Sequence, residues 1–561
     1  MIKRILGTQF AGVASAAFLI GGFSLLGKVV GLARNSIFAD KFGASAIMDI
    51  YYSAFLVPDF IYNLFVLGFL SAVFIPLFAH YFHENKEEAW HFANATLNVL
   101  FVGLAVVSVA LFFLMPFILP FLISGLPEHI KLEAISVSRI MLLSPIFLGL
   151  SSIFGSIAQN FKKYVYFSLA PIFYNFGIIF GALVFAPRFG VYGLALGVIL
   201  GALLHFSIQL YGAISIGFKY QAIFNFNHAG VLKMARLSMA RFFSIAASQI
   251  NFIILISLAS FLGVGSITIF NFANDVQFLP IGLIGLSYAV AVFPKLSEMA
   301  AKKEEESFIY EFSEAFRQIL FFVIPLGAFI FLLREEIVYL IYGGGFDAKE
   351  SHMIAAVLGF FAISIFAQSG MPILNRAFYA LQNTWIPFVT DFFSFLITII
   401  SGIIFVRVID SHGIFYDFIV KIISGDNLSG VAVVGLPMAF SLGALFNFFI
   451  TLYFLKKKVK ELDIKDLFRG GLKLFIASFS MVAVIYLVRR LFLFYGGESA
   501  GVLITAIYIL MFSILGAAIY LSALYFLKAK EYIFFKKTSR DMVGKILTLR
   551  TLGKELPESL E

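Results

Sequence analysis

Long apolar stretches recur from one end of the chain to the other, separated by short polar connections. Each is about 20 residues or longer, and a helix of that length rises about 30 Å, enough to cross the hydrocarbon core of a membrane. The stretches do not alternate apolar and polar positions, as the strands of a membrane β-barrel would. The pattern predicts about fourteen membrane-spanning helices, over residues 8–39, 47–80, 92–122, 132–159, 165–186, 191–216, 231–260, 266–296, 308–333, 351–381, 386–408, 431–455, 471–492 and 501–527.

The composition agrees with an all-α polytopic membrane protein. Of the 561 residues 61% are hydrophobic and 13% are charged, and the mean hydropathy is +0.97. The chain has no cysteine, so disulfides and thiolate metal sites are excluded. The net charge of +9 comes largely from lysine and arginine in the connections, so we expect no nucleic-acid partner.

Lysine and arginine in the short connections predict the orientation. If the N-terminus is cytoplasmic, the inner connections carry Lys86, Lys162, Lys163, Lys219, Lys295, Lys302, Lys303 and the basic run 456–466, with a further basic tail after residue 527. The outer connections hold one or two such residues each, or none. We therefore expect a multi-pass protein of the bacterial inner (cell) membrane with both termini in the cytoplasm, and no cleaved signal peptide.

An internal repeat predicts two lobes. "GLALGVILGALLHFSIQLY" (193–211) aligns without gaps to "GLPMAFSLGALFNFFITLY" (435–453), with ten of nineteen residues identical. Upstream of each copy, a Gln-Asn pair is followed by a proline and, four residues later, by Asn175 or Asp391. A chance match of two Leu-rich and Gly-rich helices is the alternative. We predict two six-helix lobes, 1–216 and 231–455, related by a pseudo-two-fold axis along the membrane normal, then two helices within 456–527 and a basic cytoplasmic tail, 528–561.

Ionisable residues inside the predicted spans are the candidate functional groups, because each costs several kcal/mol unless it meets water, a partner or a substrate. Lys28 and Arg34 lie toward the outer end of the first span, where positive charge is disfavoured. The alternative is that Lys28 only snorkels to the surface. Asp49 is the nearest candidate counter-charge. Four more such residues are Asp59, Arg241, Asp275 and Asp391, and together they favour a polar cavity between the halves that binds an amphiphile with an anionic head.

Signatures of enzymes and metal sites are scarce. The chain lacks the H-E-x-x-H, Walker A and G-x-S-x-G motifs, and its histidines fall mostly in connections or near span ends. His80, His83, Glu84, Glu87, Glu88 and His91 have the residue types of metal ligands, but a solvated loop is the better interpretation. We predict that the protein is not an enzyme and needs no metal or cofactor.

At these residues the chain resembles the lipid II flippases of the MurJ (MviN) family in the MOP exporter superfamily. The opening block "LGKVVGLARNSIFADKFGASAIMDIYYSAFLVPDFIYNLFVLGFLSAVFIP" is similar to the family pattern S-R-[VI]-L-G-x-x-R-[DE], F-G-A-G-x-x-x-D-A-F, P-N-L-x-R-R-x-F-A-E-G-A-F-S-x-A-F-[VI]-P. "IVYLIYGGGFDA" (337–348) and "LNRAFYALQNTWIP" (374–387) also match, and the similarity is collinear over about residues 8–455.

The resemblance implies a 14-helix transporter that moves the undecaprenyl-pyrophosphate-linked precursor lipid II from the inner to the outer leaflet by alternating access, in cell-wall biogenesis. It assigns substrate contact to Lys28, Arg34 and Asp49. The family's Arg-Arg pair reads Tyr62-Asn63 here, its Glu before Gly reads Leu67, and the arginine of its span eight reads Asp275. We hypothesise that Arg241 compensates in part. The alternative is a related exporter of another polyprenyl-linked glycan or a small compound.

Three further expectations concern coupling, partners and an inserted segment. Asp391 is the candidate ligand of a coupling ion, with Na⁺, H⁺ or the membrane potential as the driving force. We expect a monomer whose partners are the lipid-linked substrate, membrane lipids and, as candidates, cell-wall synthesis proteins. Residues 410–430 form either an interfacial amphipathic helix or a partner contact.

Overall fold

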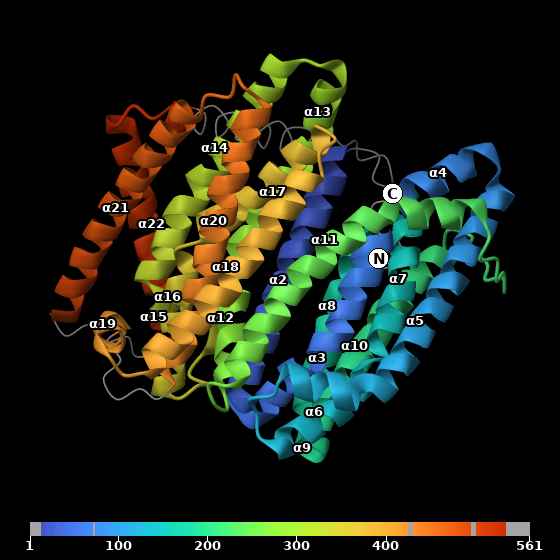
Figure 1. Ribbon diagram of the computed structural model, residues 1–561, viewed down its shortest axis with the longest axis horizontal. Coiled ribbons are helices and arrows are strands. Elements are labelled where there is room, and N and C mark those ends of the chain that lie inside the picture. Colours follow the sequence, from blue (N-terminus) through green and yellow to red (C-terminus); the bar gives the residue numbers. More distant parts are fainter. Residues whose placement is uncertain (1–12, 71–72, 424–429, 495–500, 534–561) are drawn as a thin grey trace, which may run out of the picture. The chain divides into compact units, whose positions relative to one another are not determined.

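The computed structural model describes residues 13–70, 73–423, 430–494 and 501–533, and helices dominate these ranges (Figure 1). No strand occurs within them, which confirms the all-α prediction. The helices of the first half are α2 (Val13–Phe42), α3 (Ala46–Tyr62), α4 (Phe74–Glu84), α5 (Lys86–Leu122), α6 (Glu128–Met141), α7 (Ser144–Asn160), α8 (Tyr164–Phe180), α9 (Ala186–Phe189), α10 (Val191–Ile214) and α11 (Ala229–Ser260), with π-helical segments η1 (Asn63–Leu70) and η2 (Gly181–Phe185).

The second half continues in the same way. Its elements are α12 (Ser266–Pro280), π-helical η3 (Ile281–Leu286), α13 (Ser287–Lys302), α14 (Glu305–Leu332), α15 (Arg334–Tyr342), α16 (Ala348–Ala362), α17 (Ile365–Ala380), α18 (Trp385–Asp410), α19 (Ile414–Ile423), 3-10 η4 (Val431–Val434), α20 (Gly435–Lys458), α21 (Ile464–Phe494) and α22 (Val502–Phe526).

Each of the fourteen predicted spans coincides with a helix or a short series of helices. Ten helical runs among the described residues are long and apolar enough to cross a membrane, or eleven if α16 and α17, bent by 46°, form one span. The other three predicted spans correspond to α2, to α3 with its continuation, and to α11. These three helices carry Lys28, Arg34, Asp49 and Arg241.

The chain divides into two compact units. Unit 1 consists of Met1–Asn274, Val338–Val357 and Asp391–Phe440, and unit 2 of Asp275–Ile337, Leu358–Thr390 and Ser441–Glu561. The lobe boundaries expected from the sequence repeat stay predictions. Lys3, Arg4 and most of the basic tail (534–561) lie outside the described residues, so the predicted orientation of the termini also stays a prediction.

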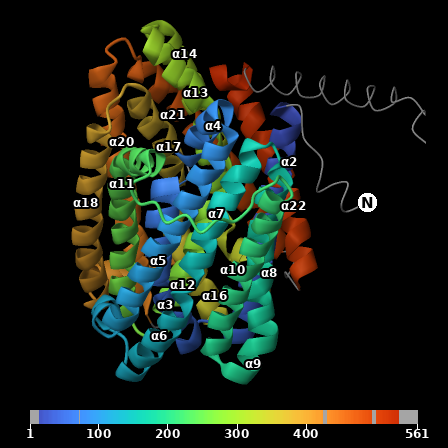
Figure 2. The ribbon, with the colours of Figure 1, turned by 90° about the vertical axis from the view of Figure 1, so that its right-hand side faces the viewer.

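Glycines bring α8 and its continuation η2 into backbone contact with α10 in unit 1, and α8 and α10 lie side by side in Figure 2. A Cβ atom on Gly177 would lie 2.2 Å from the backbone nitrogen of Gly201, and one on Gly181 would lie 2.4 Å from the Cα atom of Gly197. Glycines spaced four residues apart form a groove on one helix face, which is how apolar helices approach closely in lipid. The glycine-rich repeat read in the sequence is thus a packing surface.

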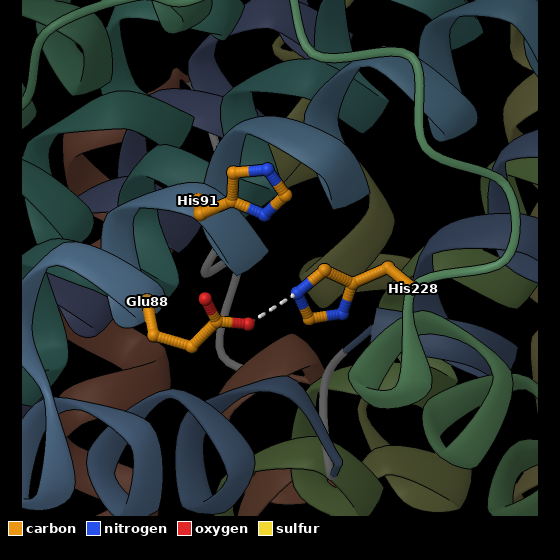
Figure 3. A group of neighbouring side chains, drawn as sticks. All are labelled: Glu88, His91 and His228. Atoms are coloured by element: carbon orange, nitrogen blue, oxygen red, sulfur yellow. Dashed lines mark hydrogen bonds and ion pairs between the residues drawn. The ribbon is translucent and has the colours of Figure 1, made fainter.

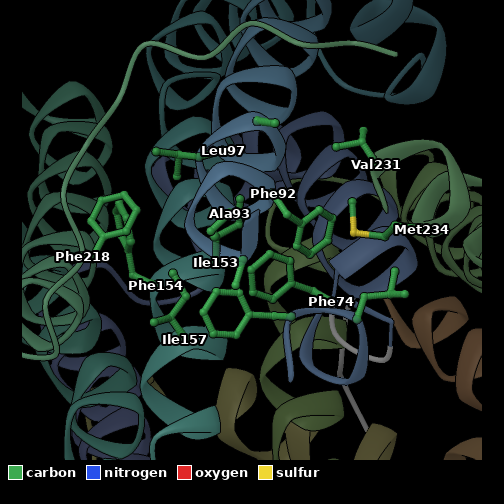
Figure 4. Packing of buried hydrophobic residues seen from close by; sticks show 14 of the residues in the cluster. Phe74, Phe92, Ala93, Leu97, Ile153, Phe154, Ile157, Phe218, Val231 and Met234 are labelled. Carbon is green, nitrogen blue, oxygen red and sulfur yellow. The ribbon is translucent and has the colours of Figure 1, made fainter. Parts of the chain in front are cut away.

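A cluster of buried aromatic and aliphatic side chains joins α4, α5, α7 and the start of α11 (Figure 4). Phe74 of α4 stacks on Phe92 of α5 with ring centroids 5.4 Å apart. Phe154 of α7 and Met234 of α11 belong to the same cluster. Because α7 and α11 are distant in sequence from the neighbouring helices α4 and α5, the cluster fixes the end of unit 1 at which α11 begins.

The inserted segment 410–430 contains a short amphipathic helix, α19. Ile419 and Ile423 are buried, whereas the charged Asp417 and Lys421 are exposed on the opposite face. The backbone carbonyl of Ile423 accepts a hydrogen bond from His352 Nε2, which attaches the helix to unit 1. The helix itself agrees with the first alternative, but its place at a membrane surface stays a prediction, and residues 424–429 lie outside the described part.

Unit 2 is held together at several points by polar contacts to α21 and α22. Arg317 of α14 pairs with Asp466 at the start of α21. The Tyr520 hydroxyl of α22 donates to the Phe321 carbonyl at 2.8 Å. Arg489 near the end of α21 pairs through Nε with Glu336 of α15 at 2.7 Å. These contacts attach the two C-terminal helices to the remainder of unit 2.

Candidate functional site

The two cations of the first span lie on α2, which packs along α8. Positions Gly27 and Gly31 of α2 face Ile172 and Asn175 of α8. Lys28 and Arg34 are both half-buried. They are six residues apart, so they project about 120° from one another on the helix.

Arg34 contacts a neighbouring amide and an aromatic ring of its own helix. Its guanidinium donates through Nε and Nη2 to the buried Asn35 Oδ1, at 3.0 and 2.8 Å, and lies 5.8 Å from the ring centre of Phe38. Across from it, Asn175 donates to the carbonyl of Pro171 at 3.0 Å, while its Oδ1 atom is buried with no hydrogen-bond partner. Asn175 is the polar residue that the sequence repeat singled out.

Asp49 has a well-defined place at the start of α12. Its Oδ1 atom accepts from the Thr268 backbone N–H at 2.9 Å and from the Thr268 hydroxyl at 2.6 Å, and its Oδ2 atom accepts from the Gly265 N–H at 2.5 Å. The side chain is fully buried. A carboxylate is favoured here because the first N–H groups of a helix have no partners within the helix and carry partial positive charge. Asp49 therefore fastens α3 to α12.

The remaining predicted site residues are dispersed. Arg241 lies in α11 of unit 1, and its side chain is outside the part that the structure describes. Asp391 is half-buried in α18 and belongs to unit 1, whereas Asp275 is half-buried in α12 and belongs to unit 2. The structure thus places Lys28 and Arg34 on one helix beside α8 and gives Asp49 a partner in α12.

A polar pocket of about 190 Å³ lies within unit 1, between α3, α7, α8 and α10. Its polar lining is Asp59 and Tyr62 of α3, Ser144 of α7, Tyr174 of α8 and His205 of α10. His205 lies inside α10, within the predicted span 191–216, and is thus an exception to the loop and span-end positions of most histidines. Asp59 was predicted as a buried candidate, but its side chain is exposed. Tyr62 was named as a departure from the family pattern, and Tyr174 and His205 were not predicted as site residues.

Glu88, His91 and His228 form a second polar group at the end of unit 1, with potential ligand atoms within 4.8 Å of one another (Figure 3). His228 Nδ1 accepts from the Gly230 N–H at 3.0 Å, so the neutral ring carries its proton on Nε2, which lies 3.0 Å from Glu88 Oε1 and donates to it. A metal on Nε2 would move that proton to Nδ1 and break the cap of α11. The group is therefore a hydrogen-bonded tie between α5 and α11, and the expectation that no metal is required stays a prediction.

Unit 2 contains two apolar cavities of about 220 and 550 Å³. Side chains of α14, α17, α20 and α21 line them, and Ile324, Phe366 and Phe475 line both. Lining of this kind suits an aliphatic ligand.

Comparison with known proteins decides the family. A family model described as lipid II flippase MurJ matches residues 38–512. The chain belongs to the MurJ family. MurJ relatives include a probable lipid II flippase of Borreliella burgdorferi, 28% identical over 390 residues that cover 69% of this chain and 76% of the relative. The lipid II flippase MurJ of Burkholderia cenocepacia is 27% identical over 409 residues, 71% of this chain and 79% of the relative.

Solved structures show the same MurJ fold. A lipid II flippase MurJ in an inward closed conformation matches with a TM-score of 0.71 and 24% identity, over 94% of this chain and all of that one. An inward-facing multidrug MATE transporter of the MOP superfamily matches with a TM-score of 0.62 and 14% identity, over 80% and 98% of the two chains. With ten or eleven apolar helices, this MurJ family member is a multi-pass protein of the bacterial inner membrane. The family is one of transporters.

The polar pocket occupies the place where this chain departs most from the MurJ pattern. The family's P-N-L-x-R-R reads Pro58, Asp59, Phe60, Ile61, Tyr62, Asn63. A neutral amide has become a carboxylate and two cations have become neutral, so the local charge changes from two positive to one negative. Asp59 and Tyr62 line the pocket, and Asn63 Nδ2 donates to Asp59 Oδ2 at 2.9 Å.

Proposed function

We propose that the protein flips lipid II, the lipid-linked peptidoglycan precursor, from the inner to the outer leaflet by alternating access. The observation that carries this proposal is the pair Lys28 and Arg34, half-buried in α2 of a chain that belongs to the MurJ family. Lysine and arginine side chains inside apolar spans mark substrate pathways, and both side chains bind phosphate groups. The alternative, an exporter of another glycan or of a small compound, is not favoured by the family match.

The apolar cavities of unit 2 suit the other end of the same substrate. A polyprenyl chain is a long hydrocarbon. Aromatic and aliphatic side chains such as Phe366 and Phe475 can pack against it without burying any polar group. We assign the tail to these cavities and the pyrophosphate to the cations of α2.

The experiment is complementation of a bacterium depleted of its own flippase, with accumulation of lipid II in the inner leaflet as the readout. We expect Lys28→Ala combined with Arg34→Ala to abolish rescue and Lys28→Arg to retain it, because arginine keeps the charge and adds a bidentate fork for phosphate. Lys41→Ala, at an exposed position of the same helix, is the matched control. Full rescue by the double variant, inserted at normal levels, would overturn the proposal.

Arg241 is proposed as a partial replacement for the family arginines that are absent from this chain. It lies in α11, within an apolar span. We expect Arg241→Ala to prevent complementation while Arg241→Lys keeps part of it. Wild-type growth of Arg241→Ala would refute this role.

Asp391 is proposed as the ligand of the coupling ion. It is a half-buried carboxylate in the apolar helix α18, and such a group can bind Na⁺ or exchange a proton. In proteoliposomes we expect the flipping rate to respond to a Na⁺ or pH gradient, and Asp391→Asn to remove that response. A rate that is independent of both gradients in the unmodified protein would argue against Asp391 and for the membrane potential.

We further propose that the protein acts as a monomer with both termini in the cytoplasm, and that cell-wall synthesis proteins are its partners. Mass photometry in nanodiscs tests the first point, and accessibility of tags at the two termini tests the second. Crosslinking in cells, followed by identification of peptidoglycan-synthesis enzymes, tests the third.

A further inference from the structure

The polar pocket of unit 1 contains a carboxylate that the protein does not neutralise. Asp59 is an exposed position of α3 that opens into the pocket. Among the described residues its hydrogen-bond partner is Asn63, which is neutral and donates to Oδ2. No lysine or arginine lines the pocket, and Asp59 forms no ion pair within the described ranges. An ionisable residue inside a membrane-spanning segment is a candidate ligand contact, and the Asp59 carboxylate can accept a positively charged partner.

Two other polar groups of the pocket also present acceptors. The Ser144 hydroxyl uses its only hydrogen to donate to the carbonyl of Met141 at 2.8 Å, which leaves oxygen lone pairs available. The Ser151 hydroxyl donates to the His205 carbonyl at 3.1 Å and lies 2.7 Å from His205 Nδ1, so the consistent assignment has Nδ1 donating to Ser151. The neutral ring then keeps a lone pair on Nε2. These two acceptors and the Asp59 carboxylate suit a ligand that is a donor.

Size and aromatic lining define the ligand further. The volume of about 190 Å³ exceeds what a single bare ion fills and admits a small organic group. Phe55, Tyr62 and Tyr174 contribute aromatic rings to the lining, and ring faces attract organic cations. A carboxylate, neutral nitrogen and oxygen acceptors, and aromatic rings together match a primary ammonium group with its three N–H donors.

We propose that this pocket binds a primary ammonium group, with Asp59 as its counter-ion. No residue of α2 lines the pocket, although Lys28, Arg34 and the pocket all belong to unit 1, and the proposed ammonium site does not depend on the proposed flipping activity. The ammonium comes either from the lipid-linked substrate, as an amino group on its peptide, or from a free small cation. Both sources share the same recognition chemistry.

The test measures binding of isobutylammonium to the purified full chain in nanodiscs without lipid II, by isothermal titration calorimetry, with isobutanol as the neutral control. We expect binding of the ammonium and none of the alcohol. Asp59→Asn keeps the size of the side chain and restores the family residue, and it should weaken binding about tenfold or more, as expected for loss of a charge-assisted contact. Glu128→Gln, at an exposed position of unit 1, should bind normally.

A second variant covers the case in which Asp59→Asn fails to fold. Tyr62→Arg keeps Asp59 and places a cation in the pocket, so it should abolish ammonium binding and raise the thermal midpoint of the purified protein. Equal binding of the alcohol, or undiminished ammonium binding in both variants, would overturn the proposal. Preferential binding of Na⁺ over isobutylammonium would overturn the assigned ligand class.

Competition distinguishes the two sources. Lipid II should displace isobutylammonium, and lipid II with acetylated peptide amino groups should not, if the ammonium belongs to the substrate. If neither lipid II nor acetylated lipid II displaces isobutylammonium, the site binds a free cation. Because the titration contains no transport step, a failure to bind ammonium leaves the flipping proposal intact, and a failure to complement leaves the ammonium site intact.

Discussion

Replacing Asp49 should detach α3 from the start of α12. The carboxylate accepts three hydrogen bonds from Gly265 and Thr268 and is fully buried. Asp49→Asn keeps one acceptor oxygen for Thr268 but turns an NH₂ group toward the Gly265 N–H, so two donors face each other. Losing one charge-assisted bond and leaving a buried N–H unsatisfied should cost about 2–4 kcal/mol. Asp49→Ala leaves three donors without an acceptor and should cost more.

Three variants that remove increasing numbers of these hydrogen bonds should show a graded loss of thermal stability. Thr268→Val removes only the hydroxyl bond and should cost about 1 kcal/mol, so the order of thermal midpoints is wild type, Thr268→Val, Asp49→Asn, Asp49→Ala. The midpoints can be measured by heating the detergent-solubilised protein and quantifying the monodisperse fraction by size-exclusion chromatography. Asp40→Asn, an exposed acid at the end of α2, is the control. A midpoint for Asp49→Ala at or above that of Thr268→Val would refute the assignment.

Two further predictions concern packing and pH. Gly197→Leu should prevent α10 from approaching α8 and sharply reduce the yield of folded protein, whereas Gly103→Leu, where an added Cβ would meet nothing within 4 Å, should be tolerated; equal yields would contradict this. Burial raises the pKa of Glu336, and the nearby Arg489 partly opposes that rise. A raised pKa means that Glu336 lowers stability as pH rises through its folded value, so Arg489→Ala should lose thermal stability at neutral pH and regain part of it in acid. A loss that is the same at both pH values would exclude this explanation.

The helices were predictable because each span is a continuous apolar run, and that signal is local. Contacts that join distant helices were not. Asp49 was visible in the sequence as an ionisable residue in a span, but its partners Gly265 and Thr268 lie 216 and 219 positions further along the chain. Periodicity places a side chain on a helix face and says nothing of which helix lies opposite.

The polar clusters likewise contain contacts between distant helices that could not be predicted from the sequence. Glu88 and His91 belonged to a cluster that the sequence analysis interpreted as a solvated loop, and the structure adds the distant His228 to two of its members. His205 is an ionisable residue inside a predicted span, but the sequence does not show that it lines the same pocket as Asp59. The family pattern identified the replaced arginines, and only the packing of four helices showed what occupies that region.

The close contact of α8 and α10 has a mechanical consequence. Two helices whose backbones touch through glycines form a rigid pair, because sliding of one helix along the other would push backbone atoms into one another. Deformation within unit 1 is then left to segments outside this contact. The π-helical segment η1 lies outside it, whereas the π-helical segment η2 contributes Gly181 to it. The segment η1 begins directly after Tyr62 in the pocket lining. A ligand in the pocket therefore contacts Tyr62, directly before η1, and also Tyr174 and His205 of the rigid pair α8 and α10.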